Sequence, residues 1–338
     1  MFYTLLRPLL FKLPPETAHR VTFSAIEKGR KLGLLSNQSI DCKSRHIIGL
    51  DFPNPVGLAA GLDKNGEHLD ALAALGFGFI EIGTVTPRPQ PGNPKPRIFR
   101  IPQANAIINR LGFNNHGVDK LVTNVINSDY QGILGINIGK NFDTPLTQAS
   151  NDYLTCLRKV YHYASYVTIN ISSPNTINLR QLQNAEELGH LLQHLKLEQT
   201  KLADKHGKYT PLAIKIAPDM EPPQVKEIAA LLMRHKIDCV IATNTTLSRE
   251  NVAGFNHAEE AGGLSGAPLT HRATTMIRHL HTHLQGEIPI IGVGGIMSAT
   301  DAQDKIKAGA NLVQIYTGLI YHGPGLVRDI AKTICAEQ

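Results

Sequence analysis

The sequence predicts an α/β fold: a closed (β/α)8 TIM barrel preceded by an N-terminal hairpin of two helices. Three observations lead to this prediction: eight short apolar runs, helical stretches between most of them, and polar residues where nearly every run ends. Runs that are apolar throughout are typical of strands covered on both faces in a parallel sheet. Eight such strands alternating with helices close into a barrel, whose chemistry lies at the carboxyl ends of the strands. An open, doubly wound sheet is the structural alternative.

The first 35 residues predict the helical hairpin. Pro14-Pro15 separates two apolar stripes, and Pro15 can begin the second helix, with Glu16 favourable at that helix's N-terminus. The first stripe is Leu5, Leu6, Leu9, Leu10 and Leu13, and the second is Ala18, Val21, Thr22, Ala25, Ile26 and Leu32. We expect residues 1–40 to be the hairpin and residues 41–338 to be the barrel domain.

Strands and helices then alternate along the chain. The predicted strands are Asn54–Gly61, Phe77–Val85, Ile133–Gly139, Tyr166–Ser172, Leu212–Pro218, Cys239–Asn244, Pro289–Gly295 and Leu312–Gly318. The predicted helices are Gly66–Leu75, Asp152–Tyr163, Ala185–Lys205, Pro222–His235, Thr270–His283 and Ala299–Ala308. Thr86–Gly132 interrupts the alternation with two short extended pieces, Arg97–Ile101 and Ala106–Asn109, and with proline-rich turns at Pro87, Pro89, Pro91, Pro94 and Pro96. We interpret it as a hairpin insertion without a helix of its own, a kind of loop that is usually functional.

Composition excludes several classes of protein. At 338 residues and 42% hydrophobic content, the chain can form one large globular domain. No apolar run approaches the roughly 20 residues of a membrane span. Arg7, Pro8 and Lys12 interrupt the N-terminal apolar residues, so no cleavable signal is predicted. The four cysteines lie far apart in the sequence, and no two of them have the short spacing typical of metal ligands: Cys42, Cys156, Cys239 and Cys335. We therefore expect reduced thiols, no metal site and a protein that faces the cytosol.

Positive charge is concentrated near the N-terminus. The net charge is +6, and residues 1–45 carry eight lysines and arginines against three acidic residues, which leaves only +1 for the other 293 residues. A basic N-terminal segment followed by a nearly neutral remainder of the chain indicates a local anionic partner rather than a nucleic-acid-binding surface. The alternative is that these side chains only solvate two surface helices.

The fourth strand ends in polar residues that could carry chemistry. The segment Asn170-Ile171-Ser172-Ser173-Pro174-Asn175-Thr176 places two amides and three hydroxyls at the mouth of the barrel. Amides donate and accept hydrogen bonds, which suits a planar ligand bearing amides and a carboxylate. A serine acts as a base only if another group takes its proton, and no His or Asp is adjacent here. The structural alternative is a side-chain turn that ends the strand.

Other strand ends carry cations and amides. Lys215 lies inside the apolar fifth strand, where it either faces a developing negative charge or forms a structural ion pair. Lys64 follows Ala59-Ala60-Gly61 at the end of strand one, where a flat ligand can approach the backbone. Polar residues also occur at the ends of strands three and six and in the insertion, at Asn137–Lys140, Thr243–Thr246 and Asn109–Asn115.

Glycines end the last two strands. Gly292–Ile296 and Tyr316–Gly318 precede predicted helices or loops, and Gly266 lies in a further glycine-rich segment. Backbone N–H groups in the loops after strands seven and eight commonly bind a phosphate in barrel enzymes. The position of these glycines therefore predicts a phosphate cradle.

Taken together, these segments resemble the dihydroorotate dehydrogenases. The matching stretches are Gly57–Lys64, Glu81–Pro96, Asn109–Gly117, Gly135–Lys140, Asn170–Asn175, Lys215–Pro218, Ala242–Thr246, Gly262–Gly266, Ile291–Ile296 and Val313–Gly318. They span nearly the whole predicted barrel, and their joint occurrence is far more specific than any one of them. The resemblance implies oxidation of (S)-dihydroorotate to orotate in de novo pyrimidine (UMP) biosynthesis, with the hydride passing to FMN.

The resemblance also implies roles for individual residues. FMN would be held by Ala60, Gly61, Leu62, Asp63, Lys64, Thr84, Asn137, Asn170, Lys215, Thr243, Gly266, Gly295, Tyr316 and Thr317. Dihydroorotate would be held by Lys64, Asn109, Arg110, Leu111, Gly112, Phe113, Asn170, Asn175, Asn244 and Thr245. Ser173 would be the catalytic base, with Thr176 and Phe113 helping to relay its proton through a water.

Serine at the base position, together with the hairpin, resembles the quinone-dependent (class 2) enzymes, whereas the fumarate- and NAD-linked classes have cysteine there. By the same resemblance, His19, Arg100 and Tyr316 would line a passage for a membrane quinone, ubiquinone or menaquinone. We expect a monomer that attaches peripherally to an anionic membrane surface, on the cytoplasmic side of the cell membrane.

The sequence departs from the family pattern at Ile177-Asn178, where many relatives have Pro-Gly. The mobility of this loop therefore cannot be transferred from them.

Two other classes of function stay open at this point. A nucleic-acid flavoenzyme, such as a tRNA-reducing barrel, would use the positive charge, but that charge lies on the hairpin. A non-catalytic membrane-surface protein could use its barrel only to bind a phosphate ligand, but the strand-end residues match a full catalytic set. Bleaching of a flavin spectrum by dihydroorotate would distinguish the three.

Overall fold

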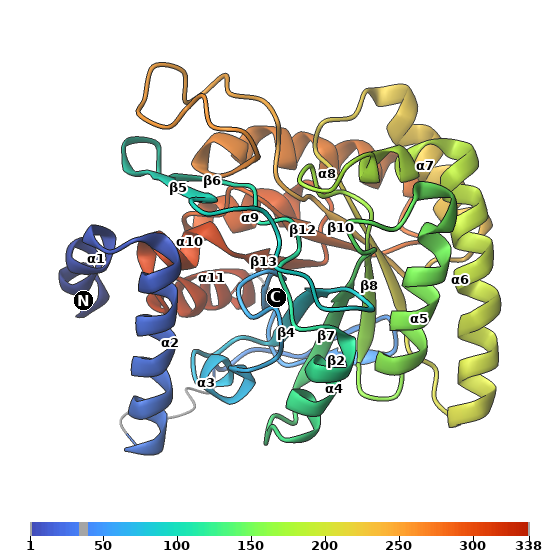
Figure 1. Cartoon of the computed structure of the whole chain (residues 1–338), viewed down its shortest axis with the longest axis horizontal. Coiled ribbons are helices and arrows are strands. Elements are labelled where there is room, and N and C mark those ends of the chain that lie inside the picture. Colours follow the sequence, from blue (N-terminus) through green and yellow to red (C-terminus); the bar gives the residue numbers. More distant parts are fainter. Residues whose placement is uncertain (1, 34–39, 337–338) are drawn as a thin grey trace.

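Eight parallel strands form a closed barrel in the computed structural model, which describes residues 2–33 and 40–336 (Figure 1). In chain order, which is also their order around the ring, they are β3 (Val56–Leu58), β4 (Phe79–Val85), β7 (Ile133–Ile138), β8 (Tyr166–Asn170), β9 (Leu212–Ile216), β10 (Cys239–Ala242), β12 (Ile290–Val293) and β13 (Leu312–Ile315). The ring closes where β13 pairs with β3, with Gln314 opposite Gly57. The predicted barrel is confirmed, and an open sheet is excluded.

Helices cover the outside of the ring. They are α3 (Leu69–Ala73), α4 (Val118–Ile126), α5 (Ala149–Val160), α6 (Ala185–His206), α7 (Pro222–Arg234), α8 (Thr270–Leu284), α9 (Ala299–Lys307), α10 (Thr317–His322) and α11 (Gly325–Cys335). Strand residues alternate between this outer layer and the barrel interior, where Phe79, Tyr166 and Ala213 belong to one buried cluster. Glu81 and Lys215 lie two positions beyond Phe79 and Ala213, so they too face the interior.

The insertion after β4 differs from its prediction in two ways. Strands β5 (Ile98–Ile101) and β6 (Ala106–Asn109) pair antiparallel as expected, but β11 (Gly263–Gly266) adds a third strand to them. The insertion also contains a helix of its own, α4, which was predicted as loop. The three valines and the one threonine of α4 have low helix propensity. Burial of Val118 and Leu121 against the barrel stabilises the helix instead.

A small antiparallel pair covers the amino end of the barrel. Strands β1 (Arg45–Ile47) and β2 (Leu50–Phe52) were not predicted, because each is only three residues long. The ring of Phe52 lies edge-on to that of Phe79, with centroids 5.1 Å apart. This contact places an aromatic side chain at the end of the barrel opposite the predicted chemistry.

The predicted N-terminal hairpin is present as α1 (Phe2–Lys12) and α2 (Pro15–Lys31), beside α10 and the β5–β6 strands (Figure 1). Arg97 on the insertion bonds Glu16 at the start of α2 at 2.8 Å, and Tyr3 and Arg7 donate to backbone carbonyls of α10. The outer leucines of α1 have no such cover: Leu5, Leu6 and Leu9 are 75%, 44% and 61% exposed. The second predicted stripe is only partly correct, since α2 buries Ala18 and Phe23 while Val21 is exposed.

The boundary between hairpin and barrel was predicted at residue 40, next to residues 34–39, which lie outside the described part of the chain. Among the described residues, no helix combines the length and apolar character needed to cross a bilayer.

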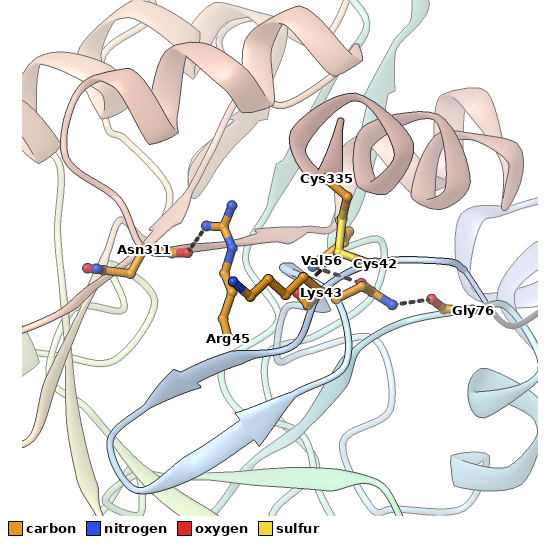
Figure 2. Close-up of a disulfide and its surroundings, with 8 residues drawn as sticks. Cys42, Lys43, Arg45, Val56, Gly76, Asn311 and Cys335 are labelled. Carbon is orange, nitrogen blue, oxygen red and sulfur yellow. Dashed lines mark hydrogen bonds between the residues drawn. A yellow bond between two sulfur atoms is a disulfide. The ribbon is translucent and has the colours of Figure 1, made fainter. Parts of the chain in front are cut away.

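The prediction that all four thiols are reduced is wrong for two of them. Cys42, just before β1, and Cys335, at the end of α11, form a disulfide (Figure 2). Their separation of 293 residues hides the pair from any spacing argument. They meet because the first and last barrel strands are neighbours, which brings both ends of the barrel chain to one place. Cys156 and Cys239 are free and buried.

Candidate active site

The carboxyl ends of the barrel strands surround a cavity of about 970 Å³, counting the part open to solvent. Most of the predicted ligand residues line it. They are Ala60, Gly61, Lys64, Thr84, Asn109, Leu111, Gly112, Phe113, Asn170, Ser173, Asn175, Lys215, Thr243, Asn244, Thr245, Gly266, Gly295, Tyr316 and Thr317. Residues from both the strand ends and the insertion therefore meet at one place, as expected from the sequence.

Four predicted ligand residues do not reach the cavity wall. Leu62 belongs to the hydrophobic core, and the Asp63 carboxylate accepts two backbone N–H groups of the following loop, at 2.8 and 3.0 Å. Arg110 turns away, because its Nη1 donates to Glu260 at 2.6 Å. Asn137 is fully buried one layer behind the wall. Any role of these four toward a ligand is indirect in this structure.

A chain of hydrogen bonds leads from the cavity into the barrel interior, through Asn170, Thr84, Asn137 and Glu81; these four residues are called the floor of the cavity. The amide Nδ2 of Asn170 donates to Thr84 Oγ1 at 2.9 Å, and the Thr84 hydroxyl donates to Asn137 Oδ1 at 2.6 Å. Asn137 Nδ2 then donates to Glu81 Oε1 at 2.8 Å. The Asn170 Oδ1 is left to accept from Ser172 at 3.0 Å. The orientation of the wall residue Asn170 is thus coupled to a carboxylate in the barrel interior.

Lys215 faces the cavity from β9 and is almost fully buried. Burial lowers the pKa of its ammonium group, while the carboxylate of Glu81 acts in the opposite direction. From sequence alone, this lysine could either face a ligand or form an ion pair. It does line the cavity, and Glu81 is the opposite charge that acts on it.

Ser173 lies on the wall with its hydroxyl only 3.2 Å from the backbone N–H of Asn175, from which it accepts a hydrogen bond. Among the described residues, its hydroxyl bonds no imidazole and no carboxylate. The loop after β8, residues 171–178, is called the serine loop below. Within it, Asn175 donates to Asn109 Oδ1 at 3.2 Å, which connects the serine loop to the insertion. Asn178 has the left-handed φ of +57° that Asn tolerates well, so the loop turns there without a glycine.

One guanidinium group connects the serine loop to the next strand ends. Arg180 donates to the carbonyl oxygens of Ser172 at 3.0 Å and Thr245 at 2.8 Å, and to the Asp219 carboxylate at 2.9 Å. Asp219 also accepts from the hydroxyl of Thr246 and from the backbone N–H of Leu247. The ends of β8, β9 and β10 are therefore connected through a single ion pair.

Lys64 supplies a second cation at the mouth. Its Nζ donates to the carbonyl oxygen of Gly61 at 2.9 Å, so the head group lies close to the backbone at the end of β3. Burial is the largest cause that lowers the pKa of Lys64, to about 8, and the positive charge of Arg97 acts in the same direction. The group is therefore protonated at neutral pH and sensitive to moderately alkaline conditions.

The glycines at the ends of β12 and β13 leave no room for side chains. A Cβ on Gly295 would lie 2.3 Å from the backbone of Thr270, and one on Gly318 would lie 2.2 Å from the carbonyl oxygen of Ile296. Both residues line the cavity. They form the narrow, backbone-lined corner that was predicted as a phosphate cradle.

The three residues predicted for a quinone passage are distributed around the hairpin. Tyr316 lines the cavity, and a Cβ on Gly61 would approach its ring to 3.3 Å. His19 Nε2 lies 2.7 Å from the carbonyl oxygen of Leu62, and burial lowers the pKa of its imidazole. Arg100 donates to the carbonyl oxygens of Phe11 and Leu13, at the end of α1.

Sequence reasoning missed several residues of the site. Gln314, Ser265 and Met297 line the cavity, and Glu81 lies directly behind it. Lys215 was identified because it is a polar residue inside an apolar strand. Glu81 and Gln314 are also polar residues inside apolar strands, so the same reasoning could have identified them. Ser265 and Met297 have no comparable signal.

A closed parallel barrel with a lysine- and amide-lined cavity at the carboxyl ends of its strands is the architecture of a barrel enzyme. The model of the family described as dihydroorotate dehydrogenase matches residues 43–337. The chain therefore belongs to the dihydroorotate dehydrogenase family.

Curated relatives and solved structures agree with this. A Nitrosospira multiformis protein named dihydroorotate dehydrogenase (quinone) is 68% identical over 335 residues, which covers 99% of this chain and 96% of the relative. One of the same name from Methylobacillus flagellatus is 62% identical, covering 99% and 100%. The crystal structure of the Eimeria tenella enzyme in complex with ferulenol has a TM-score of 0.88 at 36% identity, covering 96% and 93% of the two chains.

Proposed function

We propose that this protein oxidises (S)-dihydroorotate to orotate in de novo pyrimidine (UMP) biosynthesis and passes the electrons to a membrane quinone, ubiquinone or menaquinone. Relatives named dihydroorotate dehydrogenase (quinone) match essentially the whole chain at 68% and 66% identity. The observation that carries the proposal is the cavity itself, which brings Ser173, Lys64, Lys215 and four asparagines to one wall. Membership of the family makes the protein an oxidoreductase with a flavin cofactor.

FMN is the flavin that the cavity fits best. A Cβ on Gly295 or Gly318 would clash with the backbone of Thr270 or of Ile296, so both positions need glycine, and backbone N–H groups at such a corner suit a phosphate. When bound, FMN would take up a hydride from the substrate and give up its electrons to the quinone. Lys215 would offset the negative charge that this uptake brings.

The chain's own residues would bind and deprotonate the substrate. Lys64 would hold the dihydroorotate carboxylate, while Asn109, Asn175 and Asn244 would hold its amides, so that binding fixes the reacting carbon near Ser173. Ser173 would remove the proton from that carbon. Because its hydroxyl bonds no basic side chain in the described part of the chain, the proton would leave through a water with the help of Thr176 and Phe113.

The hairpin would provide membrane attachment and quinone access. Exposed leucines on α1 and the basic N-terminal region together suit an anionic membrane surface. His19, Arg100 and Tyr316 would line the passage of the quinone head group between hairpin and cavity. We propose that the protein is a monomer. We also propose that it has no nucleic-acid partner, since the net charge of residues 46–338 is only +1.

We also propose that the protein attaches peripherally on the cytoplasmic side of the cell membrane. The Cys42–Cys335 disulfide weighs against a strongly reducing environment, where such bonds are rare. Alkylation of intact cells followed by mass analysis of these two cysteines tests the side: free thiols in cells support the cytoplasmic side, and a complete disulfide contradicts it.

Anaerobic mixing with dihydroorotate tests the enzymatic proposal. The purified protein should be yellow, and its flavin absorbance should bleach on mixing and return on addition of a quinone. A protein that binds FMN without bleaching would exclude dihydroorotate as the substrate. Bleaching that a quinone does not reverse would exclude the quinone as the acceptor.

A further inference from the structure

Glu81 is a buried carboxylate that the proposed mechanism does not use. It is fully buried in the barrel interior, on β4. Its Oε1 accepts from Asn137 Nδ2 at 2.8 Å, and its Oε2 accepts from the Tyr166 hydroxyl at 2.9 Å and from Gln314 Nε2 at 2.8 Å. A buried carboxylate is costly unless several donors satisfy it, and here three of them do. Glu81 does not reach the cavity, so it cannot contact a ligand itself.

A carboxylate only accepts hydrogen bonds, and this property determines the orientation of each group that follows. Asn137 must present its Nδ2 to Glu81, because its Oδ1 would repel the carboxylate. Its Oδ1 therefore faces Thr84 and takes the hydroxyl proton of that residue. The Thr84 oxygen is then free to accept from Asn170 Nδ2, and Asn170 must direct its Oδ1 toward Ser172. The backbone N–H of Ser172, which also donates to Asn170 Oδ1 at 3.2 Å, favours the same direction from the other end.

A second branch orients Gln314 in the same way. Gln314 Nε2 donates to Glu81, which leaves Oε1 buried and without a partner among the described residues. Gln314 also lines the cavity. Burial, and then the adjacent Glu81, raise the pKa of the Tyr166 hydroxyl, so Tyr166 stays a donor to the same carboxylate. Both branches start at Glu81 and end at the wall of the cavity.

We infer that Glu81 is a positioning residue that sets the donor and acceptor directions of the cavity floor, through Asn137 and Thr84 to Asn170 on one side and through Gln314 on the other. The inference rests on the proposed function only in taking FMN as the ligand of that floor. Glu81 also acts on Lys215, whose ammonium it helps to keep charged. The chain of hydrogen bonds thus holds Asn170, on the cavity wall, and the fully buried Gln314 in one orientation each.

Replacement of the carboxylate by an amide of the same shape tests this. In Glu81→Gln, residue 81 can donate as well as accept, so the chain through Asn137 can run in either direction. FMN affinity should fall about ten- to hundredfold, the range expected when a hydrogen bond to a charged group is lost. Quenching of flavin fluorescence, on titration of the apoprotein with FMN, measures it. Glu287→Gln, at an exposed glutamate, is the matched control and should bind FMN as the parent does.

Moving the carboxylate one step along the chain of hydrogen bonds separates direction from packing. In the double variant E81Q/N137D, the new carboxylate at position 137 can only accept, so it takes the Thr84 hydroxyl proton and an N–H of the new amide at position 81. The carbonyl oxygen of that amide then accepts from Tyr166 and Gln314, and every later group keeps its original direction. The double variant should bind FMN within about threefold of the parent, whereas N137D alone places two carboxylates together and should bind weakly.

The outcomes are separable. Parent-like FMN affinity in E81Q, or a double variant that binds no better than N137D alone, overturns the inference. If E81Q fails to fold by circular dichroism, the comparison of the double variant with N137D decides on the same terms. A parent protein that binds FMN but is not bleached by dihydroorotate would remove the proposed substrate and leave this inference standing. A parent that binds no FMN would overturn both.

Discussion

The guanidinium of Arg180 lies 2.9 Å from the carboxylate of Asp219, and the pair joins the serine loop to the ends of two neighbouring strands. Neither side chain lines the cavity. Arg180 nevertheless bonds the carbonyl oxygens of Ser172 and Thr245, which adjoin the proposed base and belong to the proposed substrate wall. Arg180, which lies outside the cavity, therefore fixes the distance between the segment at Ser172 and the segment at Thr245.

Substitution of Arg180 should slow flavin reduction and leave FMN in place. Lysine keeps the charge but cannot bond two carbonyls and a carboxylate with one planar group. We expect Arg180→Lys to reduce the rate of bleaching by dihydroorotate about tenfold, and Arg180→Ala by more. Arg158→Lys, in the exposed pair with Glu198, is the control and should bleach at the parent rate. A parent rate in Arg180→Lys would make the ion pair a surface feature only.

Replacement of the proposed base should separate binding from chemistry. Ser173→Ala should retain FMN and still bind orotate, because the cation and the amides of the wall are unchanged. Its flavin reduction should slow about 10²- to 10⁴-fold, the usual effect of a positioned base. Stopped-flow absorbance under anaerobic conditions gives the rate. Near-normal reduction would remove Ser173 from the mechanism.

Binding of the substrate carboxylate should weaken on the alkaline side. Burial lowers the pKa of Lys64 to about 8, so the ammonium charge is present below that pH and is lost as the pH rises through it. The orotate dissociation constant, followed by the flavin spectrum from mildly acidic to alkaline pH, should therefore rise above about pH 8. In Lys64→Arg, which stays charged, the rise should disappear. A flat profile in the parent would show that Lys64 does not hold the carboxylate.

Deletion of residues 1–35 should separate the two half-reactions. Dihydroorotate should still bleach the flavin, because every proposed FMN and substrate residue lies beyond position 54. Turnover with a long-tailed quinone should collapse, while a small water-soluble acceptor still works. Circular dichroism must first confirm that the barrel is folded. Undiminished long-tailed quinone turnover would reduce the hairpin to a cover on the barrel.

Much of the fold could be predicted because each strand is an apolar run between helices, and the residues at its end share one edge of the barrel. The contacts that depend on distant parts of the chain could not. Helix α4 has weak local propensity and forms through burial of Val118 and Leu121. Strand β11 looks like a glycine loop and becomes a strand only where it meets β6.

The site shows the same division. Lys215 could be identified because a lysine inside an apolar strand needs a reason, and Glu81 obeys the same rule. The outward direction of Arg110 could not, since it depends on Glu260, 150 residues away in the chain. Asn137 was predicted as a cofactor ligand, and the structure places it behind Thr84 rather than on the wall.

The disulfide gives the barrel an unusual chain topology. Because it joins Cys42 to Cys335, nearly the whole barrel becomes a covalent ring, from which the hairpin extends as a tail (Figure 2). A single protease cut within the ring opens it without releasing a fragment, so both pieces should migrate together on a gel until a reductant is added. A cut before Cys42 should release the tail under either condition. In the chain-entropy model, closing a ring of this length favours the folded state by about 6 kcal/mol.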